Sequence, residues 1–127
     1  MIYREEAFDL IGICMEIHTA LGYGFLEIVY KDALEFELKT RIIEYEREKE
    51  YSIQYKDITL KHKFYADFVI AEKIILEIKA VDGVIIDSFV SKTINYLKVS
   101  GCKLGLIVNF GRTKLDFKRI YFDPNKQ

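Results

Sequence analysis

The sequence has few cysteines and no long hydrophobic segment. Its two cysteines, Cys14 and Cys102, form no Cys-x-x-Cys motif and no Cys/His group. This argues against a disulfide framework or a zinc site and favours reduced core residues. No apolar run approaches the ~20 residues that a membrane helix needs. The first ten residues are acidic where a secretory signal is basic and then apolar. We therefore expect a cytoplasmic protein that does not associate with membranes.

Repeats, low-complexity tracts and linkers are also lacking. The 127 residues are 50% hydrophobic and 14% aromatic, which excludes a disordered chain and suits one compact domain over residues 1–127.

Acidic residues are missing from one part of the chain. Residues 1–87 contain 11 Lys/Arg and 18 Asp/Glu, whereas residues 88–127 contain 8 and 2. Two interpretations stay open: a local face for an anionic ligand beside an acidic body, or ordinary solvated lysines. The stretch between Ser88 and Leu115 has no acid but keeps its basic residues, namely Lys92, Lys98, Lys103, Arg112 and Lys114.

Hydrophobic periodicity predicts an α/β fold. Because a helix connects the strands at 73–80 and 103–110, those two strands are expected to run parallel within a mixed central sheet flanked by helices. The expected helices span 4–21, Leu26–Arg41 and 87–99; the expected strands span 44–55, Phe64–Ala71, Lys73–Ala80, Lys103–Phe110 and Leu115–Tyr121.

The helices are amphipathic, so each has a predicted buried side. The first is expected to bury a stripe that includes Phe8 and Met15, with His18 at its edge as a packed, hydrogen-bonded histidine rather than a ligand. The buried side of the second includes Ile28 and Phe36. The third is expected to be capped by Asp87 or Ser88 and to end at Gly101.

Three charged residues interrupt the apolar strand pair at 64–80. Asp67 and Glu77 lie symmetrically about Glu72, so a hairpin that turns there sets the two carboxylates side by side. Lys79 is two residues beyond Glu77 and therefore faces the same side of the strand. Like charges in this position are destabilising unless a cation lies between them. Alternatively, Lys79 simply forms a salt bridge with one of the acids.

Carboxylate oxygens suit Mg²⁺ or Mn²⁺, and such an ion, assisted by a lysine, promotes hydrolysis of a phosphodiester. The spacing D-x9-E-x-K is by itself weakly specific for this chemistry.

The segment DFVIAEKIILEIKA resembles the active-site core of the PD-(D/E)XK nuclease superfamily, which has a restriction-endonuclease-like αβββαβ core. The segment GFLEIVY at 24–30 is similar to the signature of the GxxExxY proteins. The similarity continues through LEFELK at 34–39, EIKAV at 77–81, NYLK at 95–98 and GLIVNFG at 105–111.

The resemblance implies a role for each matching residue. Asp67 and Glu77 would bind the metal ion, with the backbone carbonyl of Ile78 as a third ligand, and Lys79 would be the catalytic lysine. The resemblance also implies that Glu27 supplies an additional catalytic carboxylate, while Tyr30 packs or hydrogen-bonds near the site.

The chain departs from its relatives at two positions of the third helix. Lys92 stands where many relatives have Gln, and Phe89 stands where relatives often have His. These departures leave the expected metal ligands intact and concern the details of the expected substrate contacts.

The leading hypothesis is a Mg²⁺- or Mn²⁺-dependent nuclease acting on nucleic acid, with DNA favoured over RNA. Lys92, Lys98 and Arg112 would contact the phosphate backbone. A homodimer would be the simplest way to cut both strands of a duplex. The alternative is a catalytically silent module that binds nucleic acid or a partner. A third option is a toxin-like or defence-associated subunit that needs a partner chain.

Overall fold

The centre of the fold is a hairpin formed by β4 (Phe64–Ile70) and β5 (Ile74–Lys79). The computed structural model describes residues 2–123 and 125. Ala71 and Glu72 close the hairpin with left-handed φ angles of 51° and 58°, the conformation that tight hairpin turns require. The predicted turn about Glu72 is therefore confirmed.

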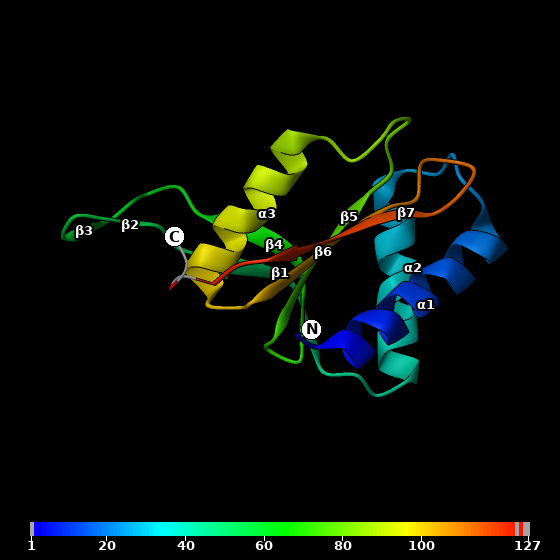
Figure 1. Cartoon of the computed structure of the whole chain (residues 1–127), viewed down its shortest axis with the longest axis horizontal. Coiled ribbons are helices and arrows are strands. Elements are labelled where there is room, and N and C mark those ends of the chain that lie inside the picture. The colour runs from blue at the N-terminus through cyan, green and yellow to red at the C-terminus, as the bar shows by residue number, and fades with distance from the viewer. Residues whose placement is uncertain (1, 124, 126–127) are drawn as a thin grey trace.

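The strands of the main sheet follow the order β1-β4-β5-β6-β7. β5 and β6 are parallel, while every other neighbouring pair is antiparallel. The helix α3 (Asp87–Ser100) makes the crossover between the parallel strands (Figure 1). The predicted mixed α/β sheet is confirmed. The outer strands are β1 (Tyr45–Tyr51), β6 (Leu104–Asn109) and β7 (Asp116–Tyr121).

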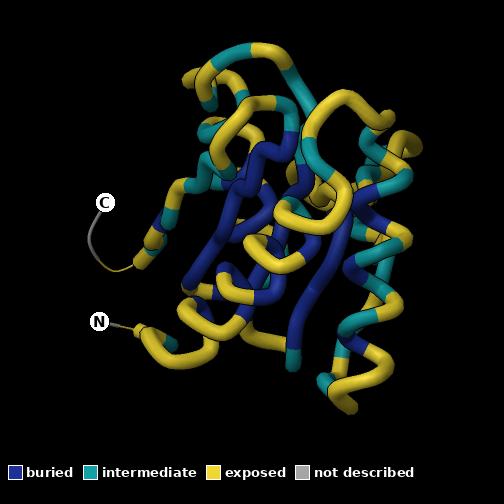
Figure 2. The backbone as a smooth tube through the Cα atoms, turned by 90° about the vertical axis from the view of Figure 1, so that its right-hand side faces the viewer, coloured by how far each residue is buried: buried dark blue, intermediate teal, exposed yellow. Residues whose placement is uncertain are grey.

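Two layers of helix cover the sheet. α1 (Arg4–Leu21) and α2 (Glu27–Thr40) lie on one face and α3 lies on the other (Figure 1). Alternation along β5 serves both layers, because Leu76 and Ile78 belong to the core under α1 and α2 while Ile75 belongs to the core under α3. Figure 2 shows the buried backbone concentrated in the strands between the helices.

The predicted buried faces of α1 and α2 are partly wrong. Phe8 is 71% exposed and Phe36 is 66% exposed, and Met15 and Ile28 are exposed as well. Apolar residues occur on more than one side of each helix, so periodicity alone does not select the side that meets the sheet. The α1 residues that do so are Ala7, Leu10, Ile11, Ile13, Cys14 and Ile17.

The strand predicted over 44–55 is also wrong in extent. In the main sheet, β1 ends at Tyr51, which pairs with Phe64, the first residue of β4. Beyond that point, β2 (Gln54–Tyr55) and β3 (Ile58–Thr59) form a separate exposed hairpin that projects away from the sheet (Figure 1). Alternating polarity continues past Tyr51, so it does not mark the end of β1.

Of the two ends of α3, only the C-terminal end agrees with the prediction. Ile86, rather than Asp87 or Ser88, occupies the N-cap position, with no side-chain cap hydrogen bond. Gly101 ends the helix with φ 78°, as expected for a glycine C-cap.

Both cysteines are free and buried, as predicted, and burial raises the pKa of the Cys14 thiol to about 12. His18 is also as predicted, because its ring packs near Phe110 and its Nε2 lies 2.8 Å from the carbonyl oxygen of Arg112. Within residues 2–123, no helix is long and apolar enough to cross a membrane.

Candidate active site

At the open end of the central hairpin, side-chain carboxylates rather than backbone carbonyls accept the hydrogen bonds between β4 and β5. The backbone ladder runs from Ile70–Ile74 to Phe68–Leu76, which leaves Asp67 opposite Glu77. There the Asp67 N–H donates to Glu77 Oε2 at 2.7 Å, and the Ile78 N–H donates to Asp67 Oδ2 at 2.8 Å. The two carboxylates therefore replace ladder bonds, and the structure does bring them together.

Glu77 lies in an environment that opposes its negative charge. Glu77 is only 3% exposed to solvent. Burial and then the charge of Asp67 raise the pKa of Glu77 to about 8, although the hydrogen bond from Asp67 and the charges of Lys79 and Lys92 act in the opposite direction. The charged form of Glu77 is thus short of positive partners.

The carbonyl group of Ile78 points toward the same place. The N–H and C=O of one strand residue point to the same side. Because the Ile78 N–H bonds Asp67 on β4, its carbonyl oxygen also faces β4, where the ladder has ended.

Lys79 is close to the acids without being neutralised by them. It lies two residues beyond Glu77 on the face that meets α3, and its Nζ is 4.7 Å from the centre of the Phe89 ring. Its Nζ forms no ion pair within 4.0 Å with Asp67 or Glu77 in the described structure, so a simple salt bridge to one of these acids does not account for it. Lys92, on α3, lies over the ring of Tyr96 at 5.7 Å.

The residue that pairs with Asp67 is Lys31, which the sequence analysis missed. Lys31 Nζ is 2.9 Å from Asp67 Oδ1, 2.6 Å from Glu48 Oε1 and 3.7 Å from Glu27 Oε2. Burial by itself lowers the pKa of Lys31, but the hydrogen bonds and charges of Glu48 and Asp67 outweigh it and hold the pKa above its ordinary value. A lysine on the buried stripe of α2, three residues before Leu34, is the signal that could have revealed it.

Glu27 and Tyr30 both lie at the start of α2. Among the residues that the structure describes, the carboxylate of Glu27 pairs with Lys31, at 3.7 Å, and with neither Asp67 nor Glu77. Tyr30 is fully buried; its hydroxyl donates to the carbonyl of Gly22 at 2.7 Å and accepts from the N–H of Phe25 at 3.3 Å. Tyr30 thus holds the loop that leads into Glu27.

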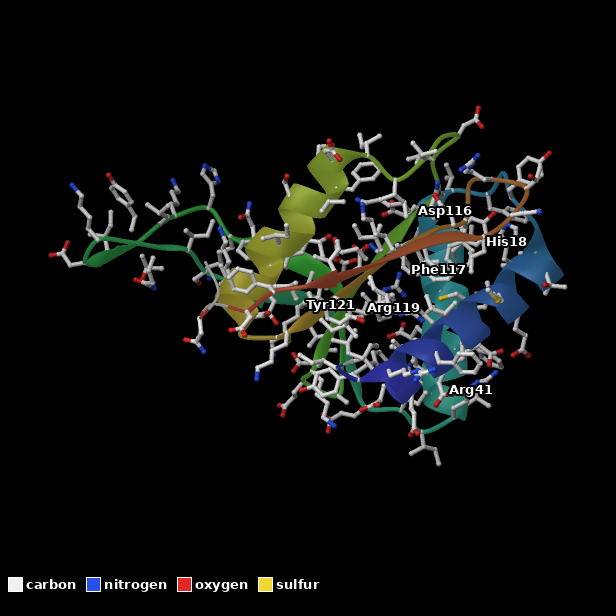
Figure 3. All side chains as sticks on the ribbon, viewed as in Figure 1. His18, Arg41, Asp116, Phe117, Arg119 and Tyr121 are labelled. Carbon is white, nitrogen blue, oxygen red and sulfur yellow. The ribbon has the colours of Figure 1, made fainter. Side chains whose placement is uncertain are left out.

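Lys98 and Arg112 are not brought to the Asp67–Glu77 pair. Lys98 is six residues beyond Lys92, about 9 Å along the helix axis, and lies over the ring of Phe122. The Arg112 guanidinium is 3.9 Å from Asp116, and its carbonyl bonds His18. Figure 3 labels His18 on α1 and Asp116 at the start of β7, whereas Lys79 Nζ lies over the ring of Phe89 on α3.

A buried asparagine supports the chain that follows Lys79. Asn109 is fully buried; its Oδ1 accepts from the N–H groups of Val81 and Gly111, and its Nδ2 donates to the carbonyls of Val81 and Gly83. Gly111 is required here because a Cβ would lie 2.2 Å from the Val81 carbonyl oxygen. Both residues lie in the segment GLIVNFG at 105–111, but neither was assigned this role from the sequence.

The donor set suits a hard divalent cation. Within residues 2–123, no three His, Cys, Asp or Glu side chains are grouped to hold a metal ion. Mg²⁺ commonly uses one or two carboxylates and completes its shell with water and phosphate. Asp67, Glu77 and the Ile78 carbonyl meet that requirement, since all three are oxygen donors at the open end of one hairpin.

The fold and the site together define an α/β domain whose central hairpin presents two acids and a lysine at one end. The chain belongs to the PD-(D/E)XK nuclease superfamily, because the family model of that description matches residues 4–120. The fold is similar to the crystal structure of SSO0001, with a TM-score of 0.60 and 23% sequence identity over 76% of this chain. The match spans 52% of that longer chain. No curated protein matches the sequence.

Proposed function

We propose that this chain is a metal-dependent nuclease that hydrolyses phosphodiester bonds in nucleic acid, with DNA preferred over RNA. The observation that supports this most is the crossed pair of Asp67 and Glu77 at the open end of the hairpin, with the ammonium of Lys79 on the same face and paired with neither acid.

Asp67, Glu77 and the Ile78 carbonyl would hold Mg²⁺ or Mn²⁺. A divalent cation held there would stabilise charge on the phosphate and would lower the pKa of a bound water. Lys79 would orient the attacking water and stabilise the charge that develops on the phosphate. Glu27 adds a carboxylate at the edge of the cluster.

In the hydrolysis, the oxygen of a water molecule bonds to phosphorus and that water gives up a proton, while the bond to the leaving sugar oxygen breaks and this oxygen takes up a proton. Lys92 is the basic residue of α3 best placed to hold the scissile phosphate, because its charge acts on Glu77. Lys98 would meet the substrate farther along α3. Arg112 would contact only a substrate that extends to the α1 side.

We place the chain with the GxxExxY proteins inside the superfamily. Its support is the joint position of Glu27 and Tyr30, since the tyrosine holds the loop from which the glutamate projects. A homodimer would bring two such sites to one duplex, and light scattering at working concentration tests this.

The direct test is cleavage of plasmid DNA, single-stranded DNA and RNA by purified protein with Mg²⁺, Mn²⁺ or EDTA. Asp67→Ala and Lys79→Ala should each reduce cleavage by at least about a hundredfold, which is typical of losing a catalytic group. Lys73→Ala, at the other end of the same hairpin, is the matched control and should cleave normally. Equal activity in all four proteins would show that a contaminant cuts the substrate.

One observation favours a second candidate function, a catalytically silent module that binds nucleic acid or a partner. The ammonium of Lys31 already pairs with Asp67, so the charge of this carboxylate is compensated without a metal ion. Calorimetry separates the two functions: salt-sensitive binding of DNA without any binding of Mn²⁺ would identify the module.

A further inference from the structure

Lys31 is a buried cation among three carboxylates from three different elements. The side chain of Lys31 is 9% exposed, and that of Asp67 is 12% exposed. Glu27 comes from α2, Glu48 from β1 and Asp67 from β4, and each has an oxygen within 4.0 Å of the ammonium. A charged group is buried only where it is paired, so this arrangement depends on all of its members.

The backbone is distorted where Glu48 meets this cluster. Glu48 lies opposite Asp67, between the pairs Arg47–Phe68 and Lys49–Ala66, and its φ of 52° is left-handed. Such a conformation is unfavourable for a residue with a side chain and is found where function or packing demands it.

Both strands change face at this point. Tyr45 and Phe68, on one side of the pair, pack in the core under α1 and α2, whereas Tyr51 and Ala66, on the other side, pack in the core under α3. The sheet thus twists at Glu48 and Asp67, and the twist leaves both carboxylates within reach of α2. Lys31 Nζ lies closer to the carboxylate of Glu48, at 2.6 Å, than to that of Asp67, at 2.9 Å.

We propose that Lys31 is a resident counter-ion that competes with the divalent cation for Asp67 and that Glu48 holds Lys31 when the cation binds. The proposal rests on the metal site proposed above and adds how that site is regulated. Lys31 occupies Asp67 Oδ1, the oxygen left free by the Ile78 N–H, so the same oxygen serves the ammonium or the metal ion. Lys31 is therefore a positioning residue that keeps Asp67 ordered without metal and sets the concentration of cation at which the site fills.

The test is calorimetric titration with MnCl₂ of the wild type and four variants, one of them a control, at one pH and ionic strength. Lys31→Met should lower the Kd for Mn²⁺ by at least about tenfold, because a positive charge close to the bound ion is removed. Glu48→Gln should raise the Kd several-fold, since Lys31 then depends more on Asp67. In the double variant Lys31→Met/Glu48→Gln, the Glu48 substitution should have little further effect. Lys49→Met, which removes a neighbouring charge outside the cluster, is the control and should bind Mn²⁺ as the wild type does.

The outcomes separate this proposal from the proposed function. If the wild type binds Mn²⁺ and Lys31→Met binds it equally or more weakly, the proposed competition by Lys31 is refuted while the metal site is retained. If neither binds Mn²⁺, both are refuted. Binding in Lys31→Met but not in the wild type supports the counter-ion. Should Lys31→Met fail to fold, Glu48→Gln decides, because an unchanged or lower Kd in that variant contradicts the role given to Glu48.

Discussion

Replacing Lys31 by Met should strongly destabilise the metal-free protein. The substitution keeps most of the apolar stem but leaves Asp67 buried without its cation. Removing one partner of a buried ion pair typically costs about 3–5 kcal/mol. The other close partner, Glu48, has a side chain that is 47% exposed, so its share is closer to the ~0–1 kcal/mol of a surface pair.

We therefore expect a loss of about 3 kcal/mol in the free energy of unfolding, at the lower end of that range because Asp67 keeps its hydrogen bond from Ile78. For a chain of this size, such a loss corresponds to a fall in Tm of about 10 °C. Equilibrium unfolding in urea with EDTA measures it. The matched control is Lys73→Met, whose partner Glu6 is 3.8 Å away and about half exposed; it should change the free energy by less than about 1 kcal/mol.

A double-mutant cycle shows whether the loss comes from the pair itself. Asp67→Asn should also destabilise the protein, and Lys31→Met/Asp67→Asn should cost about 2 kcal/mol less than the sum of the single variants. The reasoning is refuted if Lys31→Met costs less than about 1 kcal/mol, or if the two substitutions are additive.

Three further predictions concern residues that support the site or the core. Tyr30→Phe removes the hydroxyl that bonds Gly22 and should cost about 1–2 kcal/mol in urea unfolding; an unchanged midpoint would contradict the supporting role. Asn109→Ala removes the side chain that holds the loop 81–83 and should cost about 3 kcal/mol by the same assay, whereas a cost below about 1 kcal/mol would show that water replaces these bonds. The pKa of Cys14 is raised from 9.0 to about 12 in the folded state, so the stability linked to its protonation is present below pH 9 and declines as the pH rises toward 12. At pH 8 a disulfide reagent should modify Cys14 only after unfolding; rapid modification of the folded protein would contradict its burial.

The central hairpin could be predicted from the sequence because its information is local. Once the chain turns about Glu72, the register places Asp67 opposite Glu77, and the two-residue period puts Lys79 on the same face as Glu77. The parallel pairing of β5 with β6 followed in the same way from the helix between them. These features depend on residues close together in the chain and on the element that connects them, so hydrophobic periodicity is enough to predict them.

The buried faces of the outer helices could not be predicted in this way. Phe8 and Phe36 satisfy a helical period as well as the residues that are truly buried, and they remain exposed. Which side of each helix meets the sheet depends on how the two helices pack together over it. That choice belongs to the assembled domain.

Short-range spacing sets strand register, so the order of residues along the chain specifies which acids and which lysine meet at the end of the hairpin. The residues that neutralise these acids are brought to them by the packing of distant elements. Lys31 and Glu48 are 17 residues apart and belong to a helix and an edge strand, and Asp67 comes from a third element. The identity and position of a charged residue do not indicate which distant residue it will pair with. The contact among these three residues therefore forms only when α2 packs against the twisted sheet.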